Sequence, residues 1–141
     1  MHQKFRQLIL AGCAALITCV VIPAQAGVPS TLIVQGDKQW ADNKLDLAQK
    51  SFEQAVIAEP RSITAHMKLA GLQRSRQDFK GCIETYKLAI GLDAKNAKAW
   101  LGLGFAYLHS GKDDLSMAAF NEAIRVDPSN KEKLAPVLAK L

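Results

Sequence analysis

Residues 100–128 read WLGLGFAYLHSGKDDLSMAAFNEAIRVDP, and this stretch decides the fold. Four of its residues share the spacing i, i+3, i+4 and i+7 that marks one stripe of a helix: Trp100, Leu103, Gly104 and Tyr107. Ser110-Gly111-Lys112 then gives a turn signal. Pro128 ends the second apolar segment, because the residue before a proline is disfavoured in the helical conformation. The stretch therefore predicts two helices joined by a short turn.

The same pattern returns every 34 residues. The aligned columns are aromatic at Phe52, Tyr86 and Phe120; alanine at Ala55, Ala89 and Ala123; small at Gly36, Ala70 and Gly104 and again at Ala48, Cys82 and Ser116; and acidic at Glu59, Asp93 and Asp127. Facing small residues let the two helices of a pair approach closely, and the aromatic residues fill the gap to the next pair. One pair cannot bury its own apolar face, so about three stacked pairs are the minimum for a stable array. The sequence predicts three.

This pattern resembles the tetratricopeptide repeat family. The third copy carries family-type residues at Trp100, Leu103, Gly104, Tyr107, Phe120, Ala123 and Pro128. The second copy is the most divergent, with His66 in place of Trp and Ala70 in place of Gly. The resemblance implies an all-α fold, an α-solenoid of three helix-turn-helix units at residues 29–62, 63–96 and 97–130, followed by a short capping helix at 131–141.

The capping helix is also indicated by its own spacing. Its apolar residues again follow i, i+3, i+4 and i+7: Leu134, Val137, Leu138 and Leu141. Ser129 and Glu132 have the spacing of a capping box, in which each side chain satisfies a backbone donor of the other. Pro136 removes a backbone donor inside this segment, so we expect the helix either to kink there or to begin there.

The first 26 residues have the three parts of a secretory signal. Lys4 and Arg6 form a charged start, an apolar run follows from residue 8 to 22, and Ala24 and Ala26 stand at the −3 and −1 positions of a cleavage site. We therefore expect a signal peptide at 1–26, cleavage after Ala26, and a periplasmic protein formed by residues 27–141.

Two alternatives concern the same segment. The apolar run is short for a permanent membrane anchor, which needs about 20 residues. Leu10-Ala11-Gly12-Cys13 resembles a bacterial lipoprotein box, in which the cysteine becomes the acylated first residue. Processing at Cys13 would attach the protein to a membrane face.

Charge and composition exclude several functions. Without Lys4 and Arg6 the formal net charge falls from +5 to +3, which is too weak to indicate a nucleic acid or another polyanionic partner. Outside the predicted signal peptide, the histidines are His66 and His109, which fall on different predicted helix pairs, and the single cysteine is Cys82. These residues provide neither metal-ligand spacing nor a nucleophile with its base. We therefore expect no enzyme activity, no cofactor, no metal and no small-molecule substrate. Cys82 falls in a small column, which favours a buried thiol over a reactive one.

The function then has to lie in the surface that the stack creates. In the family that the chain resembles, the first helix of each pair lines a concave groove, which implies these partner-binding residues: Ile33, Asp37, Trp40, Met67, Arg74, Lys98, Leu101, Phe105 and Leu108. The family variant that grips a terminal carboxylate has Lys and Asn where this chain has Ile33 and Asp37. An apolar groove with a polar rim suits an amphipathic helix or an extended apolar peptide. The alternative is that some of these side chains pack in the core or under the capping helix.

Two functions follow. The first is a non-catalytic adaptor of the bacterial cell envelope, which holds a segment of another protein during assembly of a complex. Exported bacterial relatives of this shape serve cytochrome c maturation, pilus assembly and outer-membrane assembly, and the resemblance does not choose among them. The second is a self-associating scaffold, a homo-oligomer, with a lipid-anchored outer-membrane assembly factor as its membrane-attached form.

Overall fold

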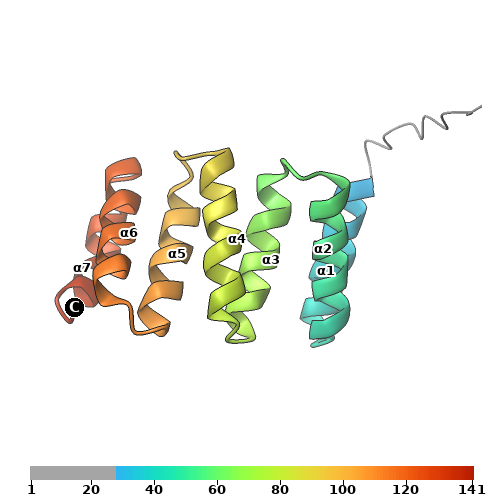
Figure 1. Cartoon of the computed structure of the whole chain (residues 1–141), viewed down its shortest axis with the longest axis horizontal. Coiled ribbons are helices and arrows are strands. Elements are labelled where there is room, and N and C mark those ends of the chain that lie inside the picture. The colour runs from blue at the N-terminus through green and yellow to red at the C-terminus, as the bar shows by residue number, and fades with distance from the viewer. Residues whose placement is uncertain (1–27) are drawn as a thin grey trace, which may run out of the picture.

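Residues 28–141 are described by the computed structural model, and they form seven helices joined by short turns. The helices are α1 (Val28–Ala41), α2 (Leu45–Ala58), α3 (Ile63–Ser75), α4 (Phe79–Leu92), α5 (Ala97–His109), α6 (Asp113–Val126) and α7 (Asn130–Leu138). Three helix pairs stand side by side, and α7 closes the row (Figure 1). The predicted all-α solenoid is therefore confirmed. The predicted signal peptide and the Cys13 box lie outside the described residues.

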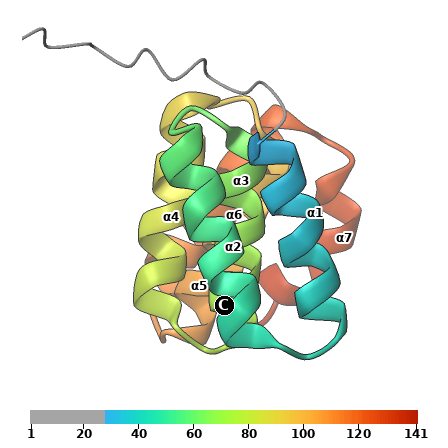
Figure 2. The ribbon, with the colours of Figure 1, turned by 90° about the vertical axis from the view of Figure 1, so that its right-hand side faces the viewer.

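The helices form two layers, which are defined by the helices that approach one another; Figure 2 views the row end on, with α1 and α2 of the first pair in front. Cα atoms of α1 and α3, and of α3 and α5, approach within 8 Å of each other. Among the described helices, α2, α4 and α6 do not approach one another in this way. The first helices of the pairs are therefore close together and the second helices are splayed apart. We call α1, α3 and α5 the inner layer, and α2, α4 and α6 the outer layer.

The small column behaves as the sequence predicts, whereas two of the three rings in the aromatic column pack on glycines of their own pair. Ala48, Cys82 and Ser116 are completely buried, as are Phe52 and Phe120. A methyl group on Gly36 would collide with the ring of Phe52, and one on Gly104 would collide with the ring of Phe120. In the second pair Ala70 replaces this glycine, and the ring of Tyr86 lies instead over Gly102 of the next pair. Packing of rings on small residues therefore fixes both the pairs and the stack.

Each pair turns at an equivalent left-handed residue. Asn43, Gln77 and Gly111 have φ angles of 59°, 62° and 68°, and they stand 34 residues apart. The next residue donates its backbone N–H to a carbonyl of the preceding helix in all three turns. Only the third turn uses glycine, which adopts this conformation without steric cost. The backbone geometry of the turn is therefore the same in all three pairs, although the residue type at the left-handed position differs.

The C-terminal helix corrects two expectations. Helix α7 begins at Asn130 and continues through Pro136, so it does not begin at the proline. The capping box is wrong, because Ser129 has helical φ and ψ angles and its side chain makes no capping bond. Asn130 is buried and donates its side-chain N–H to the carbonyl of Ala123. This bond and the burial of Leu134 attach α7 to the third pair.

Among residues 28–141, no helix is long and apolar enough to cross a membrane.

Candidate protein-binding groove

All nine predicted groove residues fall on the inner layer. Helix α1 carries Ile33, Asp37 and Trp40; α3 carries Met67 and Arg74; α5 carries Lys98, Leu101, Phe105 and Leu108. Arg74 and Lys98 are exposed, and the other seven are half-buried. Half-buried apolar side chains on adjoining helices leave an apolar surface open to a ligand. Their role in binding stays a prediction.

Three of the nine also support the core. The indole of Trp40 meets the ring of Phe52 edge to face, with 6.2 Å between ring centroids. Phe105 meets Phe120 in the same way at 5.0 Å. Met67 packs against the core of the second and third pairs. The sequence pattern places these residues in the groove, and the structure gives them a packing role as well.

An ion pair crosses the inner layer between α1 and α3. The Nζ atom of Lys68 donates to both carboxylate oxygens of Asp37, at 2.8 and 2.7 Å. The two side chains are about 40% exposed, so the pair lies at the surface of the layer. Sequence analysis missed Lys68, because its partner is 31 residues away and no local spacing signals the contact. The pair neutralises the acidic groove residue.

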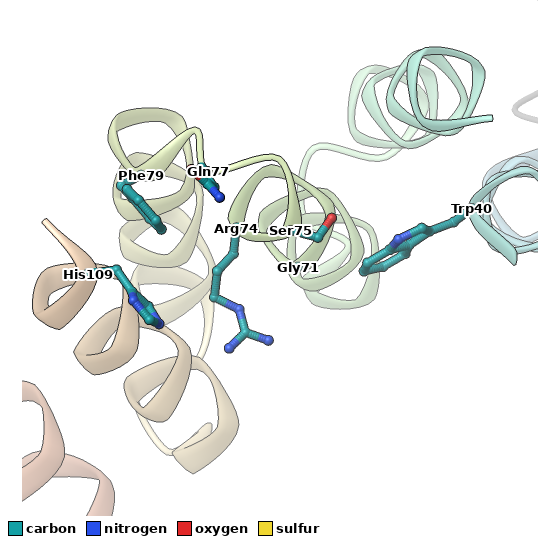
Figure 3. A pocket seen from close by; sticks show the side chains of 7 residues that line it. All are labelled: Trp40, Gly71, Arg74, Ser75, Gln77, Phe79 and His109. Atoms are coloured by element: carbon teal, nitrogen blue, oxygen red, sulfur yellow. The ribbon is translucent and has the colours of Figure 1, made fainter. Parts of the chain in front are cut away.

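A hollow of about 560 Å³ opens at the end of the inner layer where α3 terminates. It is lined by Trp40, Gly71, Arg74, Ser75, Gln77, Phe79 and His109 (Figure 3). The rings of Phe79 and His109 stack at 5.5 Å with 15° between their planes. In Figure 3 the Arg74 side chain extends between this stacked pair and Trp40. No carboxylate of residues 28–141 forms an ion pair with Arg74.

Phe79 and Gln77 belong to this hollow although the groove pattern does not include them. Gln77 lies in the turn between α3 and α4, and Phe79 is the first residue of α4. Both are outside the first helices of the pairs, on which the prediction was based. The signal that could have found Phe79 is its apolar character directly after a turn. Figure 3 shows that the turn brings it to the same space as Arg74.

Cys82 has the character of a packing residue. Its side chain is fully buried, and burial raises the pKa of the thiol to about 11, with nearby Arg74 lowering it and Asp78 raising it. The thiolate is the reactive form of cysteine, so this thiol is unreactive near neutral pH. Its predicted burial is confirmed. Within the described residues, no group of three His, Cys, Asp or Glu side chains is placed to hold a metal ion.

Comparison with known proteins identifies the repeat. Residues 33–97 and 97–130 match two models of the tetratricopeptide repeat. The chain belongs to the tetratricopeptide repeat (TPR) family. TPR arrays are protein-interaction modules, and this chain accordingly has the fold of a protein–protein interaction adaptor for a protein or peptide partner.

The TPR relatives are diverse. The chain is 36% identical over 81 residues to the general transcriptional corepressor ssn6 of Schizosaccharomyces pombe, covering 56% of this chain and 7% of that protein. It is 32% identical over 88 residues to the peptidyl-prolyl cis-trans isomerase FKBP4 of Bos taurus, covering 62% of this chain and 19% of that protein. The chain therefore spans less than a fifth of the length of these relatives.

Solved structures show the same fold. The first TPR of Spaghetti (RPAP3), bound to the HSP90 peptide SRMEEVD, superposes with a TM-score of 0.71 at 19% identity, covering 79% of this chain and 94% of that one. The type III secretion translocator chaperone SycD of Yersinia enterocolitica superposes with a TM-score of 0.73 at 15% identity, covering 83% and 91%. At these identities the similarity concerns the fold alone.

Proposed function

We propose that this TPR chain is a non-catalytic adaptor of the bacterial cell envelope that holds a segment of another protein in its inner-layer groove during assembly of a complex. The observation that carries the proposal is the set of half-buried apolar side chains on adjoining inner helices, among them Ile33, Leu101 and Leu108. The exposed parts of these side chains form an apolar surface that a ligand could cover. The solved complex of Spaghetti with the peptide SRMEEVD supports a peptide as the class of ligand.

The envelope location rests on residues 1–26. A charged start, an apolar run and a small-residue cleavage site favour export with cleavage after Ala26. Intact mass spectrometry of the protein from the periplasmic fraction tests this, and a chain that begins at Gly27 is the expected product. An acylated chain that begins at Cys13, or an uncleaved chain in the cytoplasm, would contradict the proposed processing.

Site-specific photo-crosslinking in the native host tests the groove. A photoreactive amino acid replaces Leu101 on α5 in one variant and Leu88 on α4 in the control variant. Leu88 is 59% exposed on the outer layer, so it offers a matched apolar position away from the groove. We expect a discrete adduct from position 101 and none from 88. Adducts of equal yield from both positions, or none from 101, would count against groove binding.

A self-associating scaffold has one supporting observation. A second hollow of about 390 Å³ lies between α4 and α6, over the apolar side chains Ile90, Trp100, Leu103 and Leu115. The docking of another copy there would build an oligomer. Size-exclusion chromatography with light scattering separates the two functions, since the adaptor is expected to be a monomer when pure.

A further inference from the structure

Charge is divided unequally between the two layers of the solenoid. The inner layer carries four cationic side chains and one carboxylate: Lys38, Lys68, Arg74 and Lys98 against Asp37. The outer layer carries four cationic side chains and six carboxylates: Lys50, Lys80, Lys87 and Arg125 against Asp46, Glu53, Glu84, Asp113, Asp114 and Glu122. The groove side is therefore positive and the outer side is negative, although the chain as a whole is only mildly basic.

The one inner carboxylate is already neutralised. Both oxygens of Asp37 accept hydrogen bonds from Lys68. Lys38, Arg74 and Lys98 then remain, each exposed and without a carboxylate partner among residues 28–141, and of these Arg74 and Lys98 stand at predicted groove positions. The groove therefore presents two uncompensated cations beside its apolar side chains.

The inner helices also lack the acidic residues that usually stabilise a helix start. Carboxylates near a helix N-terminus interact favourably with its partial positive charge. The first turns of α2 and α6 contain Asp46 and Asp113, whereas those of α1, α3 and α5, and of the outer helix α4, contain no acidic residue. Lys98 lies in the first turn of α5, where the helix end adds to its own charge. This end of the groove is therefore positive, and the repulsion between Lys98 and the helix N-terminus lowers the stability of α5.

At the other end, Arg74 lies in a hollow that suits a carboxylate on a short side chain. Trp40 lies on one side of the guanidinium and the stacked rings of Phe79 and His109 on the other (Figure 3). A guanidinium presents paired N–H donors that match the two oxygens of a carboxylate. The last turn of α3 attracts its own arginine and offsets part of this charge, so we expect Arg74 and Lys98 to act together.

Resting on the proposed groove function, we propose that the segment held by the groove is apolar and acidic, with side-chain carboxylates that pair with Arg74 and Lys98. Arg74 is the twelfth residue of α3 and Lys98 the second residue of α5, so they differ by ten residues in helical register. At 1.5 Å per residue, and with adjoining helices 8–10 Å apart, they are separated by roughly 18 Å. An extended segment covers that span with about five residues.

This spacing selects among possible acidic ligands. A terminal carboxylate alone is a single anionic group and cannot reach both cations, so at least one of the paired carboxylates has to belong to an Asp or Glu side chain. The outer layer of a second copy is also acidic, but three of its six carboxylates, those of Asp46, Glu53 and Glu122, already accept hydrogen bonds from side chains of their own chain. An acidic segment of a different protein, with carboxylates about five residues apart, is therefore the occupant that fits.

A displayed library of random 12-residue peptides, selected on the purified protein expressed from the full chain, tests the proposal. The strongest binder is then synthesised with fluorescein in three forms, as selected, with each Asp or Glu changed to the amide, and with each changed to Lys. Fluorescence anisotropy measures the binding of each form to wild type, to Arg74→Gln with Lys98→Gln, and to the control Lys50→Gln with Lys80→Gln. The control removes the same charge from exposed positions of the outer layer.

We expect selected peptides rich in Asp and Glu, and binding of the acidic form at least tenfold tighter than that of the amide form at about 50 mM salt. The inner double variant should abolish this difference, and the control should keep it. Neutral or basic selected peptides, or an equal loss in both double variants, would overturn the proposal. So would concentration-dependent self-association that disappears in the inner double variant, since the occupant would then be a second copy.

The same experiment separates this inference from the groove function. Amide and acidic forms that bind equally, and that both lose affinity when Leu101 is changed to Gln, would leave groove binding intact and refute only the charge preference. Binding by no peptide, or binding that Leu101→Gln does not affect, would refute the groove function itself.

Discussion

Phe120 and Phe105 touch each other, yet truncation of the two rings should have different effects. Phe120 on α6 is fully buried, and its ring lies directly over Gly104. Phe105 on α5 is half-buried and meets Phe120 edge to face at 5.0 Å. The first ring holds the third pair together. The second, in our assignment, is part of the groove that also braces this core.

The expected magnitudes follow from burial. Phe120→Ala leaves a closed cavity and should lower the free energy of unfolding by about 3–5 kcal/mol. The space left by Phe105→Ala opens to solvent, and the half-buried ring contributes only part of the hydrophobic stabilisation of a fully buried one. The free energy of unfolding should therefore fall by about 1–2 kcal/mol. A double-mutant cycle should give a coupling of about 0.5–1.5 kcal/mol for the aromatic contact. Loss of Phe120 is a serious fraction of a small domain's stability.

Urea unfolding followed by circular dichroism measures all three variants, with Leu88→Ala on the exposed outer layer as the control. Phe105→Ala should also weaken peptide binding at a temperature where it remains folded. If Phe105→Ala unfolds as readily as Phe120→Ala, or binds peptide as well as wild type, then Phe105 is a core residue and its place in the groove is wrong.

Three further predictions concern single sites. Burial raises the pKa of Cys82 to about 11 from 9.0 in the unfolded chain. The free energy of unfolding should therefore be unaffected by this thiol below about pH 9 and fall by up to about 2–3 kcal/mol towards pH 11. Cys82→Ala should remove that part of the loss, and a thiol reagent should label the native protein slowly. Gln77→Gly removes the steric cost of a left-handed backbone conformation at a residue with a side chain and should raise the free energy of unfolding by about 0.5–1 kcal/mol. The matched Asn43→Gly should give a smaller gain, and a lower melting temperature for Gln77→Gly would contradict this. Thr85→Val removes the 2.8 Å hydrogen bond to the Gln73 side chain and should cost about 1 kcal/mol in urea unfolding, and no change would mean that water replaces the bond.

The repeat columns could be predicted because close helix packing restricts them to few residue types. Where the sequence departs from the pattern, the interactions were not predictable. His66 stands in the Trp position, and its Nε2–H donates to the carbonyl of Pro60 at 2.9 Å. Trp100 donates from its indole N–H to the carbonyl of Ala94 at the same distance and the same offset of six residues. His66 therefore makes the same hydrogen bond as Trp100, which could not be predicted from the residue types alone.

A second pair of departures compensates in the same way. Gln39 and Gln73 stand where the third repeat has Tyr107, and each accepts a hydrogen bond from a hydroxyl twelve residues later, on Ser51 or Thr85. In the third repeat the position of that hydroxyl is occupied by Ala119. A tyrosine beside alanine is thus replaced by a glutamine hydrogen-bonded to a hydroxyl. Helical spacing assigns each position to the inside of a pair, but only the folded structure shows which side chain forms its hydrogen bond.

The candidate groove was predictable in position and not in detail. Repeat position places Trp40 and Phe105 on the inner layer correctly, but long rings reach both the groove surface and the core beneath it. The hollow around Arg74 was not predictable, because a turn supplies Phe79 and Gln77 to it from outside the first helices.

The double role of the groove rings links binding to stability. Trp40 braces the first pair through Phe52, and Phe105 braces the third through Phe120. A ligand that covers both rings binds the folded chain alone, so it should stabilise by about 2.7 kcal/mol at a concentration one hundred times its Kd. The selected acidic peptide should therefore raise the melting temperature of wild type, and the rise should grow with the logarithm of the peptide concentration divided by its Kd. Trp40→Ala should lose part of this rise together with part of its intrinsic stability, whereas Leu88→Ala should keep the whole rise. A peptide that binds tightly and leaves the melting temperature unchanged would show that it also binds the unfolded chain, and the groove would then not be its site.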